Sequence, residues 1–276
     1  MSNFQWQPVR ERIFVTRLQP HGVNAGLIVG DNEALLVDTG SSAQQGAALL
    51  AAAQAQAGVP VSHVMITHAH HDHWFGLAGM PGISSIAHEG LTSPDAASEV
   101  ADEAAANGLT ELPQPTRTFS LAVALDLGNR RVEMIHLGAA HTSSDVYVVV
   151  PDQDVIFAGD LIEESGEPQF GPTSSGSNWP MVLDGVIGAT TDDTVIVPGH
   201  GSVVDRYFAI RQQGDIAMFC NTAESLFEQG VGLAEAVTSA QWPDGAQPRE
   251  PALSYVYAEC ERRGIVPKRQ LPITAI

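Results

Sequence analysis

The stretch 61-VSHVMITHAHHDHW-74 decides the fold, because a short apolar run passes directly into a cluster of histidines. The first six residues have the length and composition of a buried β-strand. Alternate residues of an extended chain point to the same side, so we expect His68 and His70 to lie together. Asp72 and His73 follow where the chain turns toward a helix, and we expect them to face an adjacent position.

These residue types predict a metal site. Imidazole is the commonest side-chain metal ligand, and a nearby carboxylate suits a hard or borderline divalent ion. Three more candidates, His141, Asp160 and His200, each follow a predicted strand. Alone, each is as well explained by a turn, a helix cap or a loop. Together they indicate one site, because an open α/β sheet gathers its ligand-binding groups at the carboxyl ends of its strands.

The rest of the chain alternates β-rich and helical runs, which favours a layered α/β sandwich. The expected strands are Arg12–Arg17, Ala25–Val29, Ala34–Val37, Val61–Ile66, Ser84–Ala87, Phe119–Leu125, Arg131–His136, Asp145–Val150, Val155–Phe157 and Val195–Val197. The expected helices are one capped by Ser41 or Ser42 that runs to Ala57, one around Ala96–Ala106, one over Trp179–Ala189, and a helical stretch from Asp205 onward. No flexible linker is evident, so we expect a single domain over 1–276 with a helical C-terminal extension from about 205.

Composition excludes several classes of partner. The 276 residues include 13 basic and 32 acidic side chains, for a net charge of −19 at pH 7. Such a surface repels phosphate backbones and anionic lipid, so neither nucleic acid nor membrane is an expected partner. Two cysteines, no signal-peptide pattern and no apolar run near 18 residues predict a cytoplasmic protein. We expect a small-molecule substrate, and the C-terminal helices are a candidate homodimer surface.

Taken together, these motifs resemble the metallo-beta-lactamase superfamily. The matching features cover roughly residues 12–205: Asp38-Thr39-Gly40, the HxHxDH segment, Gly138–Thr142, Gly159-Asp160 and Pro198–Gly201. The resemblance implies a four-layer αββα sandwich of two mixed sheets flanked by helices, with a metal site between the sheets.

The resemblance also implies a role for each candidate. A first metal would be bound by His68, His70 and His141, and a second by Asp72, His73 and His200. Asp160 would bridge the two ions, and Asp38 would orient the ligands.

The expected activity follows from that site. Two zinc ions, with iron or manganese as alternatives, would share a water and deliver hydroxide to the carbonyl of an ester, thioester, lactone or amide. Asp72 or a water on the metals would help protonate the leaving group, and Asp160 would hold both ions in place. Two other classes stay open, a mononuclear iron enzyme of the persulfide dioxygenase type and a non-catalytic metal- or ligand-binding protein.

The sequence differs from the motifs of known subgroups of the superfamily, and these differences exclude some substrate classes without identifying one. The aspartate at position 160 resembles the glyoxalase II and lactonase side of the superfamily more than the true beta-lactamases. Glyoxalase II has Gly-His-Glu-Tyr-Thr where this chain has Gly199-His200-Gly201-Ser202-Val203. Lactonases carry a tyrosine shortly after the bridging aspartate, whereas Leu161-Ile162-Glu163-Glu164 follows here.

Overall fold

The computed structural model describes residues 4–239, 241–242 and 250–267. The first half of the chain contains strands β1 (Gln7–Arg10), β2 (Ile13–Leu18), β3 (Val23–Val29), β4 (Ala34–Val37), β5 (Val61–Met65), β6 (Ser84–His88), β7 (Arg117–Phe119) and β8 (Ala122–Asp126). Its α-helices are α1 (Ala43–Ala57), α2 (His71–Trp74), α3 (Pro94–Glu99) and α4 (Ala101–Ala106), and two 3-10 turns, Phe75–Gly79 and Glu89–Thr92, accompany them.

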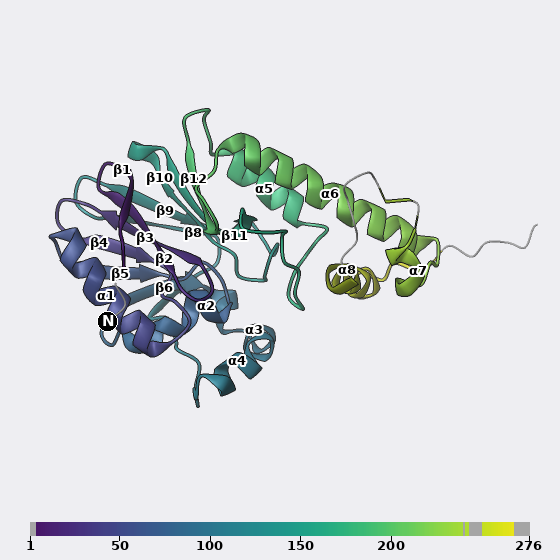
Figure 1. Cartoon of the computed structure of the whole chain (residues 1–276), viewed down its shortest axis with the longest axis horizontal. Helices are drawn as coiled ribbons and strands as arrows, with labels where there is room; N and C mark the ends of the chain where they lie inside the picture. The colour runs from purple at the N-terminus through teal and green to yellow at the C-terminus, as the bar shows by residue number, and fades with distance from the viewer. Residues whose placement is uncertain (1–3, 240, 243–249, 268–276) are drawn as a thin grey trace, which may run out of the picture.

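The second half contains the remaining strands and the longer helices. The strands are β9 (Arg131–Ile135), β10 (Tyr147–Val150), β11 (Val155–Glu163) and β12 (Val195–His200), with a 3-10 turn at Pro151–Gln153. The helices are α5 (Trp179–Gly188), α6 (Arg206–Glu228), α7 (Leu233–Val237) and α8 (Glu250–Arg262). In Figure 1, α6 extends away from the sheets, and α7 and α8 lie beside its far end.

The strands form two mixed sheets that meet at one point. Strands β1 to β7 form one sheet, in which β4, β5, β6 and β7 are parallel. Strands β8 to β12 form the other, in which β11 and β12 are the parallel pair. A single pairing, His200 with Val23, joins β12 to β3 and makes the strand order continuous across both sheets. The junction therefore lies at one of the candidate ligands.

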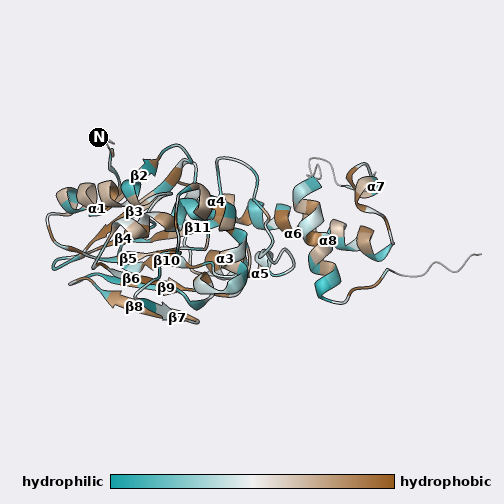
Figure 2. Ribbon diagram, turned by 90° about the horizontal axis from the view of Figure 1, so that it is seen from below, coloured by the Kyte–Doolittle hydropathy of each residue, from teal (hydrophilic) through white to brown (hydrophobic). Residues whose placement is uncertain are grey.

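Three separate cores show the αββα layering. A central core between the sheets contains Leu35 and Val37 of β4 and Val148 and Val150 of β10. The alternate residues of β4, such as Leu36, face the core beneath α1. Strands β3 and β4 lack polar alternation because both of their faces are covered, as is typical of inner layers. Figure 2 shows the sheets at one end of the molecule and α6 to α8, with hydrophobic and hydrophilic residues interspersed, at the other.

The outer layers follow from the sequence signals for helices. Ser42 caps α1 by accepting a hydrogen bond from the amide of Gln45, and Gly58 ends the helix in the left-handed region (φ 70°). The other face is covered by α5 and α6, which pack on β11 and β12 through residues such as Trp179, Leu183 and Ile216. None of the helices in the described ranges is long and apolar enough to cross a membrane.

Two expected elements are wrong in detail. The single strand predicted over Phe119–Leu125 is two strands at opposite ends of the sheet order, because β7 pairs with β6 and β8 pairs with β9. The helix predicted around Ala96–Ala106 is broken at Val100 into α3 and α4. The single-domain organisation stays a prediction, and residues 268–276 of the expected extension lie outside the described ranges.

Candidate metal centre

The histidine-rich segment changes direction between two groups of ligands. β5 ends at Met65, the chain bends at His68 and Ala69, His70 is extended (φ −107°, ψ 149°), and α2 begins at His71. The start of this short helix separates His68 and His70 from Asp72 and His73, as the sequence predicts. Both pairs leave the end of a strand buried between neighbours β4 and β6, so the backbone that carries them is fixed.

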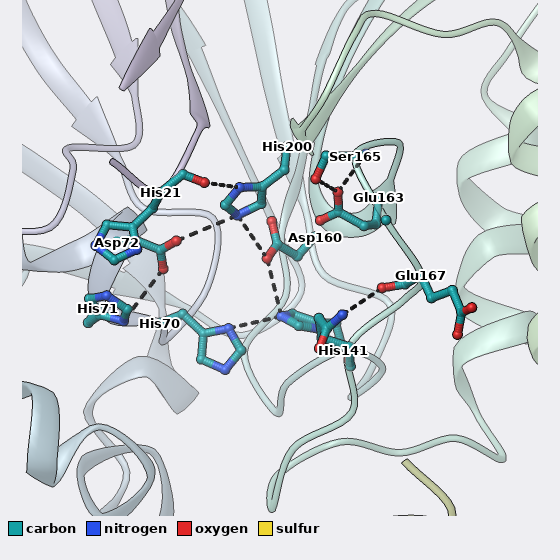
Figure 3. A pocket seen from close by; sticks show the side chains of 12 residues that line it. His21, His70, His71, Asp72, His141, Asp160, Glu163, Ser165, Glu167 and His200 are labelled. Carbon is teal, nitrogen blue, oxygen red and sulfur yellow. Dashed lines mark hydrogen bonds and ion pairs between the residues drawn. The ribbon is translucent and has the colours of Figure 1, made fainter. Parts of the chain in front are cut away.

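The first cluster joins three imidazoles and a carboxylate. His68, His70, His141 and Asp160 each offer one ligand atom, and these atoms lie within 4.8 Å of one another. His70 Nδ1 lies 3.1 Å from His68 Nε2 and 2.9 Å from His141 Nε2. Figure 3 shows His70 and His141 directed toward each other across the pocket. His68 and His141 are each 1% exposed, whereas the His70 side chain is 24% exposed and lines the pocket.

The second cluster joins Asp72, His73 and His200, again within 4.8 Å. His73 Nε2 and His200 Nε2 are 3.3 Å apart, and Asp72 Oδ2 lies 3.5 Å from His200 Nε2. His200 ends β12 while the other two belong to α2, so the cluster spans the junction of the two sheets (Figure 3).

Asp160 lies between the clusters. Its Oδ2 is 3.5 Å from the Nε2 atoms of both His141 and His200, and its Oδ1 is 3.3 Å from His73 Nε2. Oδ1 is buried and accepts no hydrogen bond from any described residue. The Asp160 carboxylate fits in this place because the neighbouring strand carries a glycine, Gly199. A Cβ at position 199 would overlap Asp160 Oδ1. A buried carboxylate oxygen without a donor is costly in free energy unless a cation contacts it.

Hydrogen bonds at the outer nitrogens of three imidazoles determine which nitrogen faces the centre. His141 Nδ1 donates to the carbonyl of Gln169 (2.9 Å), and His200 Nδ1 donates to the carbonyl of His21 (3.0 Å). His73 Nδ1 donates to Asp38 Oδ2 (2.8 Å). In the neutral form of each ring the Nε2 lone pair therefore faces the cluster, the arrangement typical of metal-binding histidines.

Asp38 organises the segment from the end of β4. Its Oδ1 accepts from the Thr67 amide (2.8 Å), and its Oδ2 accepts from the Thr67 hydroxyl (2.9 Å) as well as from His73. Because the Thr67 hydroxyl donates to Asp38, it accepts from His68 Nδ1 at 3.0 Å and leaves His68 Nε2 free for the centre. Asp38 adopts a positive φ of 63°, an uncommon conformation in which aspartate is enriched. That Asp38 orients the ligands, as the resemblance implies, stays a prediction, and these are the contacts through which it would do so.

The electrostatics favour the metal-binding protonation states of His68, His141 and Asp160, whereas, against the effect of burial, the nearby carboxylates raise the pKa of His70, His73 and His200. Burial, with help from the neighbouring imidazoles, lowers the pKa of His68, and it lowers that of His141 to about 4. Burial disfavours the Asp160 carboxylate, but the imidazoles of His73 and His68 outweigh it and lower its pKa. Burial likewise opposes the charged form of His73, yet Asp160, Asp38 and Asp72 raise its pKa to about 10. Neutral imidazole and ionised carboxylate are the ligand forms, so a metal at the second cluster must displace a proton from His73.

The donor set fits divalent metal ions. Two nitrogen lone pairs at 2.9–3.3 Å repel unless a cation, either a proton or a metal ion, lies between them. Tetrahedral zinc with Zn–N bonds of 2.0–2.1 Å separates its nitrogen ligands by about 3.3 Å. The observed spacings and the donorless Asp160 oxygen both match that requirement, and the two clusters provide for two ions.

The structure thus brings together all seven residues that the sequence predicts as ligands: His68, His70, Asp72, His73, His141, Asp160 and His200. His71 lies outside both clusters and contacts the His21 ring edge-on at 4.7 Å. Both line a pocket of about 430 Å³ above the centre (Figure 3).

Three residues near the centre escaped the sequence-based prediction. His21, which is not among the site residues predicted from the sequence, lines the pocket. Glu163, at the end of β11, forms a third carboxylate-rich group with Asp160 and His200. Burial raises its pKa despite hydrogen bonds from Ser165. Glu99 lies 3.6 Å from His70 Nε2. None belongs to a motif, and no local signal in the sequence points to them.

An αββα sandwich with adjoining His/Asp clusters at the junction of its sheets defines a class of metal-binding proteins, and comparison with known proteins gives the family. The model of the metallo-beta-lactamase superfamily matches residues 18–200. The chain belongs to this superfamily.

Curated relatives include metallo-beta-lactamase type 2 of Bacillus cereus, 27% identical over 148 residues, which cover 53% of this chain and 54% of the relative. The protein of the same name from Bacteroides fragilis is 26% identical over 141 residues, covering 50% of this chain and 55% of that one. The chain thus matches about half the length of these relatives.

Solved structures share the fold. A metallo-beta-lactamase from Pontibacter korlensis superposes with a TM-score of 0.63 at 20% identity, covering 78% of this chain and 99% of that one. A metallo-beta-lactamase from Erythrobacter litoralis, with beta-mercaptoethanol in its active site, gives 0.62 at 20% identity, covering 79% and 97%. These relatives are named as beta-lactamases, so the closer likeness to glyoxalase II and lactonases expected from Asp160 stays a prediction.

Proposed function

We propose that this protein is a hydrolase with two zinc ions, which cleaves the carbonyl bond of a small ester, thioester, lactone or amide. The observation that carries the proposal is the convergence of five imidazoles and two aspartates on adjoining clusters that share Asp160. His68, His70 and His141 would hold one ion, Asp72, His73 and His200 the other, and Asp160 both.

Bound at these clusters, two divalent ions would supply a water of lowered pKa and an electrophile for the substrate carbonyl. The chain's own residues support that chemistry. The hydrogen bonds at the outer nitrogens hold the imidazoles in place, and Asp38 secures the segment that carries His68 and His73. Such preorganisation avoids a reorganisation cost when charge develops on the substrate.

Asp72 is the proposed proton donor to the leaving group. Its carboxylate lines the pocket, with Oδ2 3.5 Å from His200 Nε2 and Oδ1 3.7 Å from His71 Nδ1. It therefore faces both the second cluster and the space that a substrate would fill. A proton taken up at its free oxygen would be within reach of an amine, thiol or alcohol leaving group there.

Beta-lactams belong among the cyclic amides to be tested. The relatives at 26–27% identity bear the name metallo-beta-lactamase, and their similarity covers about half of this chain. That name supports placing a beta-lactam beside open-chain esters, thioesters and lactones in the substrate panel.

The completeness of the second cluster argues for two ions rather than the single iron of a persulfide dioxygenase. Asp72, His73 and His200 provide three ligands of their own, which a mononuclear site would leave unused.

The test combines metal analysis with a hydrolysis panel. The purified protein should carry about two zinc ions per chain and cleave at least one carbonyl class. His68→Ala and Asp160→Asn should lose both metal and activity. His63→Asn, which changes a histidine that faces Glu33 far from the clusters, should lose neither. Iron with sulfur-dependent oxygen uptake would instead favour the dioxygenase. A fully metal-loaded protein that is inert across the panel would indicate a binding protein.

A further inference from the structure

Glu99 is a buried carboxylate beside the first cluster. It ends α3, in the segment that links β6 to β7, and its side chain is 6% exposed. Buried glutamates are rare unless they are paired. Glu99 is paired here with His70 and Thr173, so its carboxylate is held within the protein next to the candidate metal centre.

One oxygen of Glu99 faces His70. Glu99 Oε1 lies 3.6 Å from His70 Nε2, a charge contact longer than a hydrogen bond. The opposite ring nitrogen, Nδ1, is the one that faces His68 and His141. Glu99 thus occupies, for His70, the place that Asp38 occupies for His73: a carboxylate behind the ring that favours a proton on the outer nitrogen and a lone pair on the inner one.

The other oxygen fastens a wall of the pocket. Glu99 Oε2 accepts a hydrogen bond from the Thr173 hydroxyl at 2.5 Å. Thr173 belongs to the segment 164–178 between β11 and α5, which approaches Glu99 so closely that a Cβ on Gly171 would overlap its Oε1. This segment also supplies the carbonyl of Gln169 that accepts from His141, and Ser174 donates to the His141 carbonyl at 2.5 Å.

Glu99 is therefore the point where three parts of the molecule meet: α3, the ligand His70, and the segment 164–178. Residues 165, 166, 167 and 169 of that segment line the pocket. A displacement of Glu99 would disturb both a ligand and the wall that a substrate contacts.

We propose that Glu99 is a positioning residue that acts through two separate oxygens, holding His70 for the first metal ion and the segment 164–178 for the substrate. The inference rests on the proposed function, because it assumes that the first cluster binds metal. It assigns to a residue of the β6–β7 segment, outside the family motifs, control over both metal affinity and substrate binding.

The test separates the two oxygens with three variants and a control. Glu99→Ala removes both contacts, Glu99→Gln keeps two polar groups without the charge, and Thr173→Val removes only the contact to the segment. Asp102→Asn, on the neighbouring helix α4 and exposed, removes one negative charge without touching the centre. Zinc affinity is measured by competition with a chromophoric chelator, and the ligand geometry by the visible spectrum of the Co²⁺-loaded protein.

Glu99→Ala should weaken one of the two zinc sites by about 10- to 100-fold and alter the Co²⁺ spectrum, as expected when the partner of a ligating histidine is lost. Glu99→Gln should recover part of that affinity. Thr173→Val leaves the Glu99 contact with His70 and the Gln169 and Ser174 contacts with His141 in place. It should therefore keep zinc affinity within about twofold of wild type while raising KM. Asp102→Asn should change neither.

Wild-type zinc affinity and an unchanged Co²⁺ spectrum in Glu99→Ala would overturn the proposal. If that variant does not fold, unchanged values in Glu99→Gln overturn it equally. An equal loss in Asp102→Asn would do so too, because the effect would then come from net charge. A loss of zinc affinity in Thr173→Val as large as in Glu99→Ala would refute the division between the two oxygens. A wild-type protein that binds zinc but cleaves no substrate would defeat the proposed activity alone, since zinc affinity and the Co²⁺ spectrum do not depend on turnover.

Discussion

Replacing Asp38 with Asn should remove the second metal ion while preserving the fold. Asp38 accepts three hydrogen bonds, from the Thr67 amide, the Thr67 hydroxyl and His73 Nδ1. Asparagine has nearly the same shape but only one acceptor oxygen, and its amide group donates. If the asparagine oxygen still accepts from the Thr67 amide, the asparagine NH₂ faces His73 Nδ1. In the wild type, His73 Nδ1 donates its proton to Asp38 Oδ2 at this place, so two donors now face each other.

The imidazole must then reverse its proton position. His73 Nδ1 becomes the acceptor, and the proton moves to Nε2, which points at His200 Nε2 3.3 Å away. That proton blocks the lone pair required by the second ion. Loss of such a partner typically costs 10- to 100-fold in metal affinity, or about 1.4–2.8 kcal/mol.

The assay is a zinc titration against a chelator, followed by metal analysis after gel filtration. Asp38→Asn should retain one zinc ion tightly and lose the other. With both proteins depleted of metal, its unfolding transition should lie close to that of the wild type. Asp31→Asn is a suitable control, because Asp31 forms an exposed ion pair with Arg12 that lies away from the centre. Two zinc ions bound by Asp38→Asn with wild-type affinity would refute the tautomer reasoning.

Three further predictions test other parts of the structure. Gly199→Ala should weaken metal binding and cost about 1–3 kcal/mol of stability, because its Cβ would overlap Asp160 Oδ1. Gly214→Ala, whose Cβ has open space, is the control and should do neither. Metal analysis and urea unfolding test this, and equal behaviour of the two variants would contradict it. Zinc at about 100 times its Kd should raise the unfolding free energy by about 2.7 kcal/mol per site, and addition of EDTA should reverse the gain in a thermal melt; a melting temperature that ignores zinc would argue against a site formed only in the folded protein. His88 stacks on His136 with ring centroids 3.7 Å apart, and burial together with His136 lowers the pKa of His88 from 6.5 to about 4. The unfolded chain therefore binds this proton first as the pH falls, and stability present above about pH 6.5 is lost toward pH 4, by about 2 kcal/mol between pH 7 and pH 5. His88→Asn should lose correspondingly less over that interval in urea titrations, and equal losses would show that this pair does not govern the acid sensitivity.

Local sequence signals predicted much of the fold. The return strand Ala34–Val37, the helix ending at Ala57 and the strand before the histidines were all predictable, since hydrophobic runs, the Ser42 cap and Gly58 act within a few residues. The prediction of one strand over Phe119–Leu125 was wrong, because β-propensity carries no information on which strand a segment pairs with. Ser120 and Leu121 carry the chain from the β7 edge of one sheet to the β8 edge of the other, and only long-range pairing reveals it.

The sequence by itself determined the chemistry of the centre, because ligand types and their placement after strands are properties of single segments. His68, His70, Asp72 and His73 needed no further information, since strand and helix geometry fix their relative directions. Apart from Asp38, which the resemblance implies, only the tertiary structure shows which carboxylates lie beside those ligands. Glu99 and Glu163 come from positions without any motif, and their proximity to the centre results from the packing of α3 and the length of β11. Such contacts depend on distances between segments remote in the chain, which the pattern of a single sequence does not encode.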